Sequence, residues 1–167
     1  RDEYRWALAA GVQVTLDNLH PLREWSELFR GRELFVRIDP GVGRGHHQHV
    51  RTGGERSKFG IAVAEAAEVA SRAAAVGARI VGLHAHAGSG VLDVANWMHV
   101  GEVLIGLREV FPDAKVFDLG GGLGVPDRLG GDALDLRNLD VALAALRANL
   151  SDIEIWIEAG GFVIAEG

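Results

Sequence analysis

The chain has 167 residues, of which 48% are hydrophobic and 24% are charged. This composition predicts one globular domain with a buried core and argues against disorder. The net charge of −6 argues against a general nucleic-acid-binding protein, which would carry a basic face. The absence of cysteine excludes a disulfide framework, a thiolate metal site and a cysteine nucleophile, and it fits a cytoplasmic protein. No apolar run approaches the roughly 18 residues of a membrane span.

Strand-like and helix-like segments alternate along the chain. Runs rich in β-branched and apolar residues predict strands at 11–16, 33–38, 79–86, 115–119 and 153–157. Alanine-rich or amphipathic segments predict helices at 20–30, 62–76, about 93–110 and 135–150. Asp93 is a candidate N-cap and Gly77 a candidate C-cap. The apolar run 162–165 also resembles a strand.

This alternation predicts an α/β fold with a parallel sheet and right-handed crossovers. Two architectures are compatible with it, an open doubly wound sheet and part of a TIM-type (β/α) barrel. Polar residues at the carboxyl ends of several strands favour the barrel, which builds its sites there. These residues are Asp39, His84, His86, Asp118 and Glu158. A closed barrel has eight strands and this chain supplies about five, so we expect one fragment of a single barrel domain, with earlier strands preceding Arg1.

The segment His84-Ala-His86-Ala-Gly-Ser89-Gly90 is the first candidate site motif. Residues two apart in a strand face the same side, so both histidines can point into one site. The small residues that follow expose backbone N–H groups and a hydroxyl, which suits a phosphate. The alternative is two core histidines followed by an ordinary glycine turn.

The glycine-rich segment after the fourth strand is the second motif. Gly120, Gly121 and Gly122 allow the backbone to approach an anion closely. A single loop of this kind is also typical of a flexible strand-to-helix connection. Two such loops at the same end of neighbouring strands predict one phosphate cup.

Glu158 follows the fifth strand and is the third candidate. A carboxylate that leaves an apolar strand needs a cationic partner if it is buried, and a protonated pyridine nitrogen is one such cation. The alternative is a solvated glutamate.

Histidines also raise the question of a metal ion. His46, His47 and His49 lie in a predicted loop without companion cysteines, so we expect a loop over the site mouth. The pair His84 and His86 would also fit a metal-dependent hydrolase. The glycines at later strand ends favour phosphate instead, and we predict no metal.

Five motifs occur in an order that resembles a known family. They are Val36-Arg-Ile-Asp-Pro-Gly-Val-Gly, Thr52-Gly through Ser57-Lys-Phe-Gly-Ile61, Leu83-His-Ala-His-Ala-Gly-Ser-Gly90, Asp118-Leu-Gly-Gly-Gly-Leu-Gly-Val125 and Glu158-Ala-Gly-Gly161. The chain is similar to the alanine-racemase-type barrel of the decarboxylases that depend on pyridoxal 5′-phosphate (PLP), and within it to the diaminopimelate decarboxylases. The loop with three histidines resembles the form fused to aspartate kinase.

The resemblance implies roles for individual residues. His86 would stack on the pyridine ring and Glu158 would pair with the ring nitrogen, so these two are the catalytic candidates. The phosphate would be held by Ser89 and by the glycine loop Gly120, Gly121 and Gly122, with the backbone of Ala159, Gly160 and Gly161. The implied reaction is decarboxylation of meso-diaminopimelate to L-lysine by a homodimer. Decarboxylation of ornithine, arginine or carboxynorspermidine, and a non-catalytic homologue, are the alternatives.

Two departures from the family pattern are present. The family has Glu-Pro-Gly-Arg where this chain has Glu158-Ala-Gly-Gly161, so an arginine that contacts phosphate or substrate is replaced by Gly161. The Schiff-base lysine of the family does not match Lys58 or Lys115, the two lysines present. We expect that lysine upstream of Arg1 and a C-terminal β-domain beyond the chain, and we expect residues 1–167 alone to be inactive.

Overall fold

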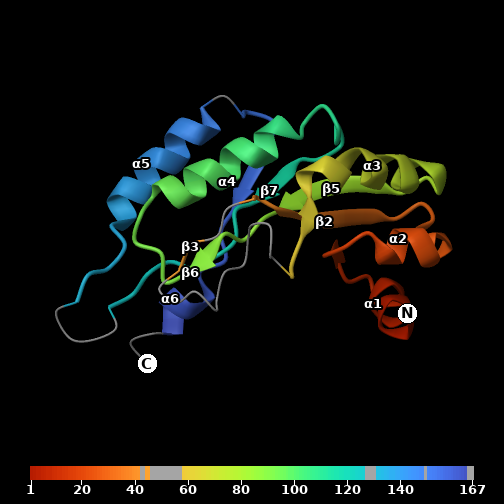
Figure 1. The fold of residues 1–167 in the computed structure, drawn as a ribbon, viewed down its shortest axis with the longest axis horizontal. Helices are drawn as coiled ribbons and strands as arrows, with labels where there is room; N and C mark the ends of the chain where they lie inside the picture. Colours follow the sequence, from red (N-terminus) through yellow and green to blue (C-terminus); the bar gives the residue numbers. More distant parts are fainter. Residues whose placement is uncertain (42–43, 46–57, 127–130, 149, 165–167) are drawn as a thin grey trace.

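The computed structural model describes residues 1–41, 44–45, 58–126, 131–148 and 150–164 (Figure 1). Its main sheet has the strand order β1-β2-β5-β7-β8, and all neighbouring strands are parallel. The strands are β1 (Thr15–Leu16), β2 (Glu33–Asp39), β5 (Arg79–His84), β7 (Val116–Asp118) and β8 (Glu154–Trp156). Each strand is added on the same side of the preceding one. A doubly wound sheet reverses this order at a switch point, so the sheet is an arc of a barrel and the predicted partial (β/α) barrel is confirmed.

Helices connect these strands. They are α1 (Asp2–Ala9), α2 (His20–Glu24), α3 (Ala66–Ala75), α4 (Ala95–Gly106), α5 (Leu136–Arg147) and α6 (Gly160–Ile164), with short 3-10 turns η1 (Ser26–Phe29) and η3 (Val63–Glu65). In Figure 1, α4 and α5 lie side by side and α3 lies next to β5. Within the described residues, no helix has the length and apolar character needed to cross a membrane.

Three two-residue strands lie near the carboxyl end of the sheet. The strand β4 (Ile61–Ala62) pairs with the end of β2, while β3 (Arg44–Gly45) pairs with β6 (Gly88–Ser89) in a small separate sheet. Through these pairings, the short strands β3 and β4, which both follow β2 in the chain, lie near the strand ends that carry the candidate site residues.

The two faces of the main sheet carry different residues. Val36, Leu83 and Phe117 are register neighbours on β2, β5 and β7, and all three are almost completely buried. They belong to the apolar core that also contains Trp97 and Leu104 of α4. Because side chains alternate along a strand, the next residue of each strand faces the opposite side.

That second row is polar. It consists of Arg37, His84 and Asp118, which are again register neighbours on β2, β5 and β7. All three lie at or near the carboxyl ends of their strands, and the sheet therefore places a cation, an imidazole and a carboxylate in one line at the end where barrels build their sites.

The predicted C-cap Gly77 is present, and the start of α5 carries an N-cap that had not been predicted. The side chain of Asp135 accepts hydrogen bonds from the backbone N–H groups of Arg137 (2.9 Å) and Asn138 (3.2 Å), which fixes the start of α5. Gly77 follows α3 with φ of +68°, a conformation that glycine adopts without strain. At α4 the N-cap position is Val94, one residue after the predicted Asp93, whose side chain accepts from the N–H of Ala95 at 2.9 Å.

The prediction of a strand at 162–165 was wrong for the described residues. Gly160–Ile164 form the short helix α6, in which the Val163 N–H donates to the carbonyl of Ala159 at 3.0 Å. A short apolar run fits both the repeat of a strand and the repeat of a helix, so its sequence alone does not distinguish a strand from a helical turn. The predicted helix 20–30 is split at Trp25, where φ is −135°, and α1 had not been predicted.

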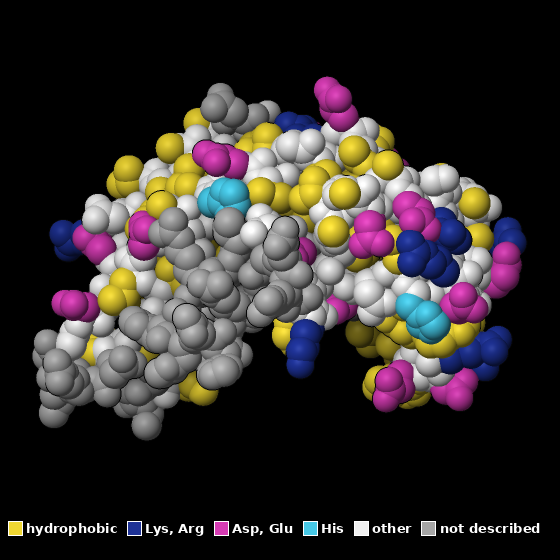
Figure 2. Space-filling view, viewed as in Figure 1, with side chains coloured by type: hydrophobic (Ala, Val, Ile, Leu, Met, Phe, Trp, Pro, Cys, Tyr) yellow, Lys and Arg dark blue, Asp and Glu magenta, His cyan; other side chains and the backbone are white. Residues whose placement is uncertain are grey.

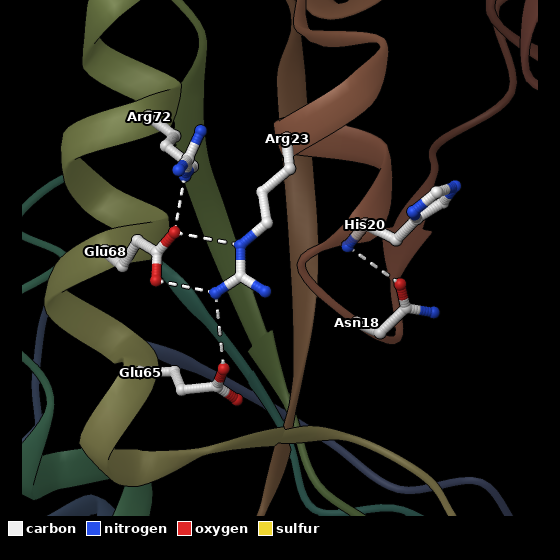
Figure 3. Close-up of polar contacts among 6 residues, drawn as sticks. All are labelled: Asn18, His20, Arg23, Glu65, Glu68 and Arg72. Atoms are coloured by element: carbon white, nitrogen blue, oxygen red, sulfur yellow. Dashed lines mark hydrogen bonds and ion pairs between the residues drawn. The ribbon is translucent and has the colours of Figure 1, made fainter.

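An ion-pair network joins α2 to α3 (Figure 3). The Arg23 guanidinium makes two hydrogen bonds with the Glu68 carboxylate (3.0 and 2.7 Å), and Arg72 adds a third at 2.6 Å. Glu65 lies 3.6 Å from Arg23. Figure 2 shows acidic and basic side chains interleaved over this end of the molecule. The hydrogen bonds from Arg23 and Arg72 lower the pKa of Glu68 to about 2.

The Glu68→Gln variant should be less stable than the parent at neutral pH, with a melting temperature about 2 °C lower. Glu68 has a folded-state pKa below its ordinary 4.5, so its stabilising contribution is present above pH 4.5 and is lost as the pH falls toward 2. Thermal unfolding at several pH values measures this difference. Glu27→Gln is the control, since Glu27 pairs with Arg30 within one turn. Equal effects of the two changes at every pH would contradict the prediction.

Candidate functional site

Three loops at the carboxyl end of the sheet are held together by backbone hydrogen bonds. The Ala85 N–H donates to the carbonyl of Asp118 (2.9 Å), which joins the loop after β5 to β7. The Glu158 N–H donates to the carbonyl of Gly120 (3.1 Å), which joins the loop after β8 to the loop after β7. The parallel pairing thus continues beyond the strands, and it brings the three predicted motifs into one site.

The glycine loop, Gly120 to Gly122, packs closely between the loop after β5 and the loop after β8. Gly120 and Gly122 have φ of +70° and +80°. A Cβ atom on Gly122 would overlap the carbonyl oxygen of Gly88, and one on Gly121 would overlap that of Glu158. The sequence had indicated that these glycines let the backbone approach an anion. The structure gives a further reason for them, because side chains there would push the loops apart.

His86 has a defined protonation state. Its Nδ1 accepts a hydrogen bond from the Gly121 N–H at 3.1 Å, so the proton of the neutral ring is on Nε2. Burial, and then the nearby Arg37, lower the pKa of His86 and favour this neutral form. The half-buried ring is thereby fixed against the glycine loop as a flat, uncharged surface that can stack on an aromatic ligand.

Glu158 and Asp118 form a pair of neighbouring acids. Asp118 is buried, and its Oδ1 accepts from the Gly120 N–H at 2.9 Å. The Glu158 side chain is 54% exposed. Burial, followed by the charge of Asp118, raises the pKa of Glu158, while His86 and Arg37 act in the opposite direction. A cation bound beside Glu158 would therefore favour its ionised form.

Arg37, the described guanidinium that acts on Glu158, is engaged elsewhere. Arg37 donates to Asp17 at 3.3 Å, and its guanidinium lies 4.9 Å from the centre of the Phe59 ring. His84 lies 3.7 Å from the Glu158 carboxylate, but burial lowers the pKa of this histidine. A bound group with a protonated ring nitrogen would supply a positive charge beside the Glu158 carboxylate. The His86 ring offers such a group a flat surface for stacking. The residues present therefore fit a pyridine cofactor.

The same acids could also take a metal ion. Ligand atoms of His84, Asp118 and Glu158 all lie within 4.8 Å of one another. The sequence had pointed to glycines at the later strand ends and did not anticipate this grouping, which depends on the strand register. His46, His47 and His49, the other histidines considered for a metal, lie outside the described residues.

The remaining residues considered in the sequence are exposed, and one of them lies far from this centre. Ser89 is exposed on β6, and Gly160 and Gly161 are exposed at the start of α6, where a Cβ atom on either would meet nothing within 4 Å. Lys115 lies at the amino end of β7 and pairs with Asp152 at 2.9 Å, at the opposite end of the sheet from the site. Lys58 is exposed next to Phe59.

Arg37 was missed as a site residue. Its signal in the sequence was its place two residues before Asp39, which puts it on the same face of the predicted strand.

Residues 1–165 match the protein family described as "Pyridoxal-dependent decarboxylase, pyridoxal binding domain". The chain belongs to this family. The diaminopimelate decarboxylase of Methanothermobacter thermautotrophicus is 40% identical to this pyridoxal-binding domain over 141 residues, which cover 81% of the chain and 33% of that relative. The diaminopimelate decarboxylase of Escherichia coli is 30% identical, with coverage of 93% and 38%.

A solved structure shows the same fold. The diaminopimelate decarboxylase of Helicobacter pylori, complexed with L-lysine, superposes with a TM-score of 0.85 over 99% of this chain and 44% of that one, at 24% identity. The pyridoxal-binding domain described here spans about a third to two fifths of the length of the curated relatives named above.

Proposed function

We propose that this chain is the cofactor-holding part of a decarboxylase that converts meso-diaminopimelate to L-lysine and CO₂. The observation that carries the proposal is the Glu158 carboxylate, which lies beside Asp118 at the carboxyl end of the sheet, while Arg37, the described guanidinium that acts on it, already pairs with Asp17. Family membership names the cofactor class, and the curated relatives described above are diaminopimelate decarboxylases. We further propose a cytoplasmic homodimer, in keeping with the absence of cysteine and with the family resemblance.

Each residue contributes one physical effect. PLP, when bound, supplies an electron sink for the carbanion left by loss of CO₂. Glu158 keeps the ring nitrogen protonated, which strengthens that sink. His86, held by Gly121, stacks on the ring and excludes water from one face of it. Ser89, Gly122 and the backbone of 159–161 hold the phosphate, and the covalent lysine is supplied from outside residues 1–167.

The affinity for PLP should depend on pH through Glu158. Only the ionised carboxylate can pair with the protonated ring nitrogen, and the pKa of Glu158 is raised above its ordinary 4.5. Affinity should therefore fall as the pH drops through this raised pKa, and the fall should begin above pH 4.5. Equilibrium dialysis of the intact protein against PLP measures it. Glu158→Gln should remove this component of the pH profile, whereas an unchanged profile in that variant would contradict the assignment.

Gly161 departs from the family pattern, which has arginine at this position, and a single substitution can reverse the departure. A Cβ atom at Gly161 would meet nothing within 4 Å among the described residues, so a side chain can start there without a clash. Gly161→Arg should tighten PLP binding about threefold to tenfold, because a guanidinium can form charge-assisted hydrogen bonds with a phosphate. Gly161→Gln is the control for side-chain size without charge. If both variants bind PLP like the parent, the phosphate lies away from the start of α6.

The reaction itself is tested by CO₂ release from the intact protein with PLP. Carboxyl-labelled meso-diaminopimelate, ornithine, arginine and carboxynorspermidine are offered separately, and only the first should be consumed at a substantial rate. Release from another of the four would keep the cofactor role and change the substrate. Absence of release from all of them, despite bound PLP, would favour the non-catalytic homologue.

A metal-dependent hydrolase is the second candidate, because His84, Asp118 and Glu158 bring three ligand atoms within 4.8 Å. Zinc enzymes commonly use three such protein ligands. Treatment with a chelator separates the two functions. We expect CO₂ release to be unaffected by EDTA, and loss of activity that zinc restores would instead support the metal centre.

A further inference from the structure

His84 is a buried histidine that the proposed mechanism does not yet use. The residue is 9% exposed, and its Nε2 has no hydrogen-bond partner among the described residues. Buried polar atoms are nearly always paired, since leaving one unpaired costs the free energy of its lost hydration. A histidine with a purely structural role would be expected to satisfy this nitrogen within the core.

Charged and titratable groups face His84 from every neighbouring strand. Arg37 lies beside it on β2 and Asp118 beside it on β7, both as register neighbours. Asp17, from the end of β1, also acts on it electrostatically. From the loop after β8, the Oε2 atom of Glu158 lies 3.7 Å from Nε2. His86 lies in the loop that continues β5.

The side chains of His84 and Glu158 differ in how freely they can move. The His84 side chain is 11% exposed and sits within the sheet, whereas that of Glu158 is 54% exposed and sits in a loop. His84 is therefore the fixed partner and Glu158 the movable one. Asp118 disfavours the ionised form of Glu158, so a donor beside this carboxylate would favour that form.

We propose that His84 is a positioning residue for Glu158. When the cofactor binds, a small shift of the Glu158 side chain closes the 3.7 Å separation, so that the His84 Nε2–H donates to the carboxylate and holds it toward the ring nitrogen. The assignment rests on the proposed function, because it presupposes that Glu158 pairs with a pyridine nitrogen. It requires the neutral tautomer of His84 with its proton on Nε2, which is the nitrogen that faces Glu158.

The test compares two ligands on the intact protein. One is PLP, and the other is its carbocyclic analogue, in which a C–H group replaces the ring nitrogen. Glu158 can favour only the first. His84→Leu should weaken PLP binding about tenfold, as for the loss of a hydrogen bond to a charged group, and should leave the affinity for the analogue unchanged.

Two further variants locate the donor on the ring. His84→Gln places an amide N–H near the position of Nε2 and should restore the preference for PLP, whereas His84→Asn places it near Nδ1 and should not. The ratio of the two dissociation constants is measured within each variant, so a loss of stability common to both ligands cancels.

The outcomes separate this proposal from the proposed function. Equal weakening of both ligands by His84→Leu, or no weakening of either, would overturn the positioning role while PLP binding by the parent stands. Restoration by Asn instead of Gln would assign the effect to Nδ1 and would also overturn it. A parent protein that binds neither ligand would overturn the proposed function, and with it this inference.

Discussion

Gly122→Ala should lower the free energy of unfolding by about 2–4 kcal/mol. Two effects combine at this position. The φ of +80° is unfavourable for any residue with a Cβ atom, and that Cβ atom would overlap the carbonyl oxygen of Gly88. Because relief of the overlap separates the glycine loop from the loop after β5, turnover at saturating PLP should fall by about 100-fold. Denaturant unfolding and CO₂ release measure the two losses.

Gly77→Ala is the matched control for Gly122→Ala. Gly77 has a similar φ of +68°, but a Cβ atom there would meet nothing within 4 Å. It should therefore show only the conformational part of the loss, about 1–2 kcal/mol, with PLP-dependent turnover unchanged. If the two variants lose equal stability and both keep their turnover, the close packing of Gly122 against Gly88 has no functional role.

Glu158→Gln should reduce kcat/KM for decarboxylation by about 100-fold, a loss typical of removing one group that stabilises developing charge. Glutamine preserves the size of the side chain and removes the charge that keeps the ring nitrogen protonated. Initial rates of CO₂ release at saturating PLP give the value, so a weaker affinity for the cofactor does not contribute.

Glu154→Gln is the control, on the strand that precedes Glu158. Glu154 is exposed at the amino end of β8 and accepts a hydrogen bond from Trp156 Nε1 at 3.2 Å. Its substitution therefore removes a carboxylate of the same kind outside the candidate site. Its rate should match that of the parent. A Glu158→Gln rate within about threefold of the parent would show that ring protonation does not depend on this carboxylate.

Much of the fold followed from local patterns in the sequence. Alternating strands and helices predicted the parallel sheet, and Gly77 marked the end of α3 because capping depends on a few adjacent residues. The short run 162–165 failed for the opposite reason. Its apolar residues fit the repeat of a strand and the repeat of a helix equally well, so that contacts with the surrounding chain determine that it forms α6.

The candidate site was only partly predictable. His84, His86, Asp118 and Glu158 could be placed at strand ends from the order of elements alone. The contact between His84 and Glu158 at 3.7 Å could not, because it depends on the lateral register of three strands and on hydrogen bonds between loops.

The protonation state of the ring nitrogen tests the central claim most directly. PLP labelled isotopically at that nitrogen is bound to the intact protein, and its nitrogen chemical shift is recorded by nuclear magnetic resonance for the parent and for Glu158→Gln. The account predicts a protonated nitrogen in the parent and an unprotonated one in the variant. The same protonation state in both proteins, or no bound PLP in the parent, would contradict it.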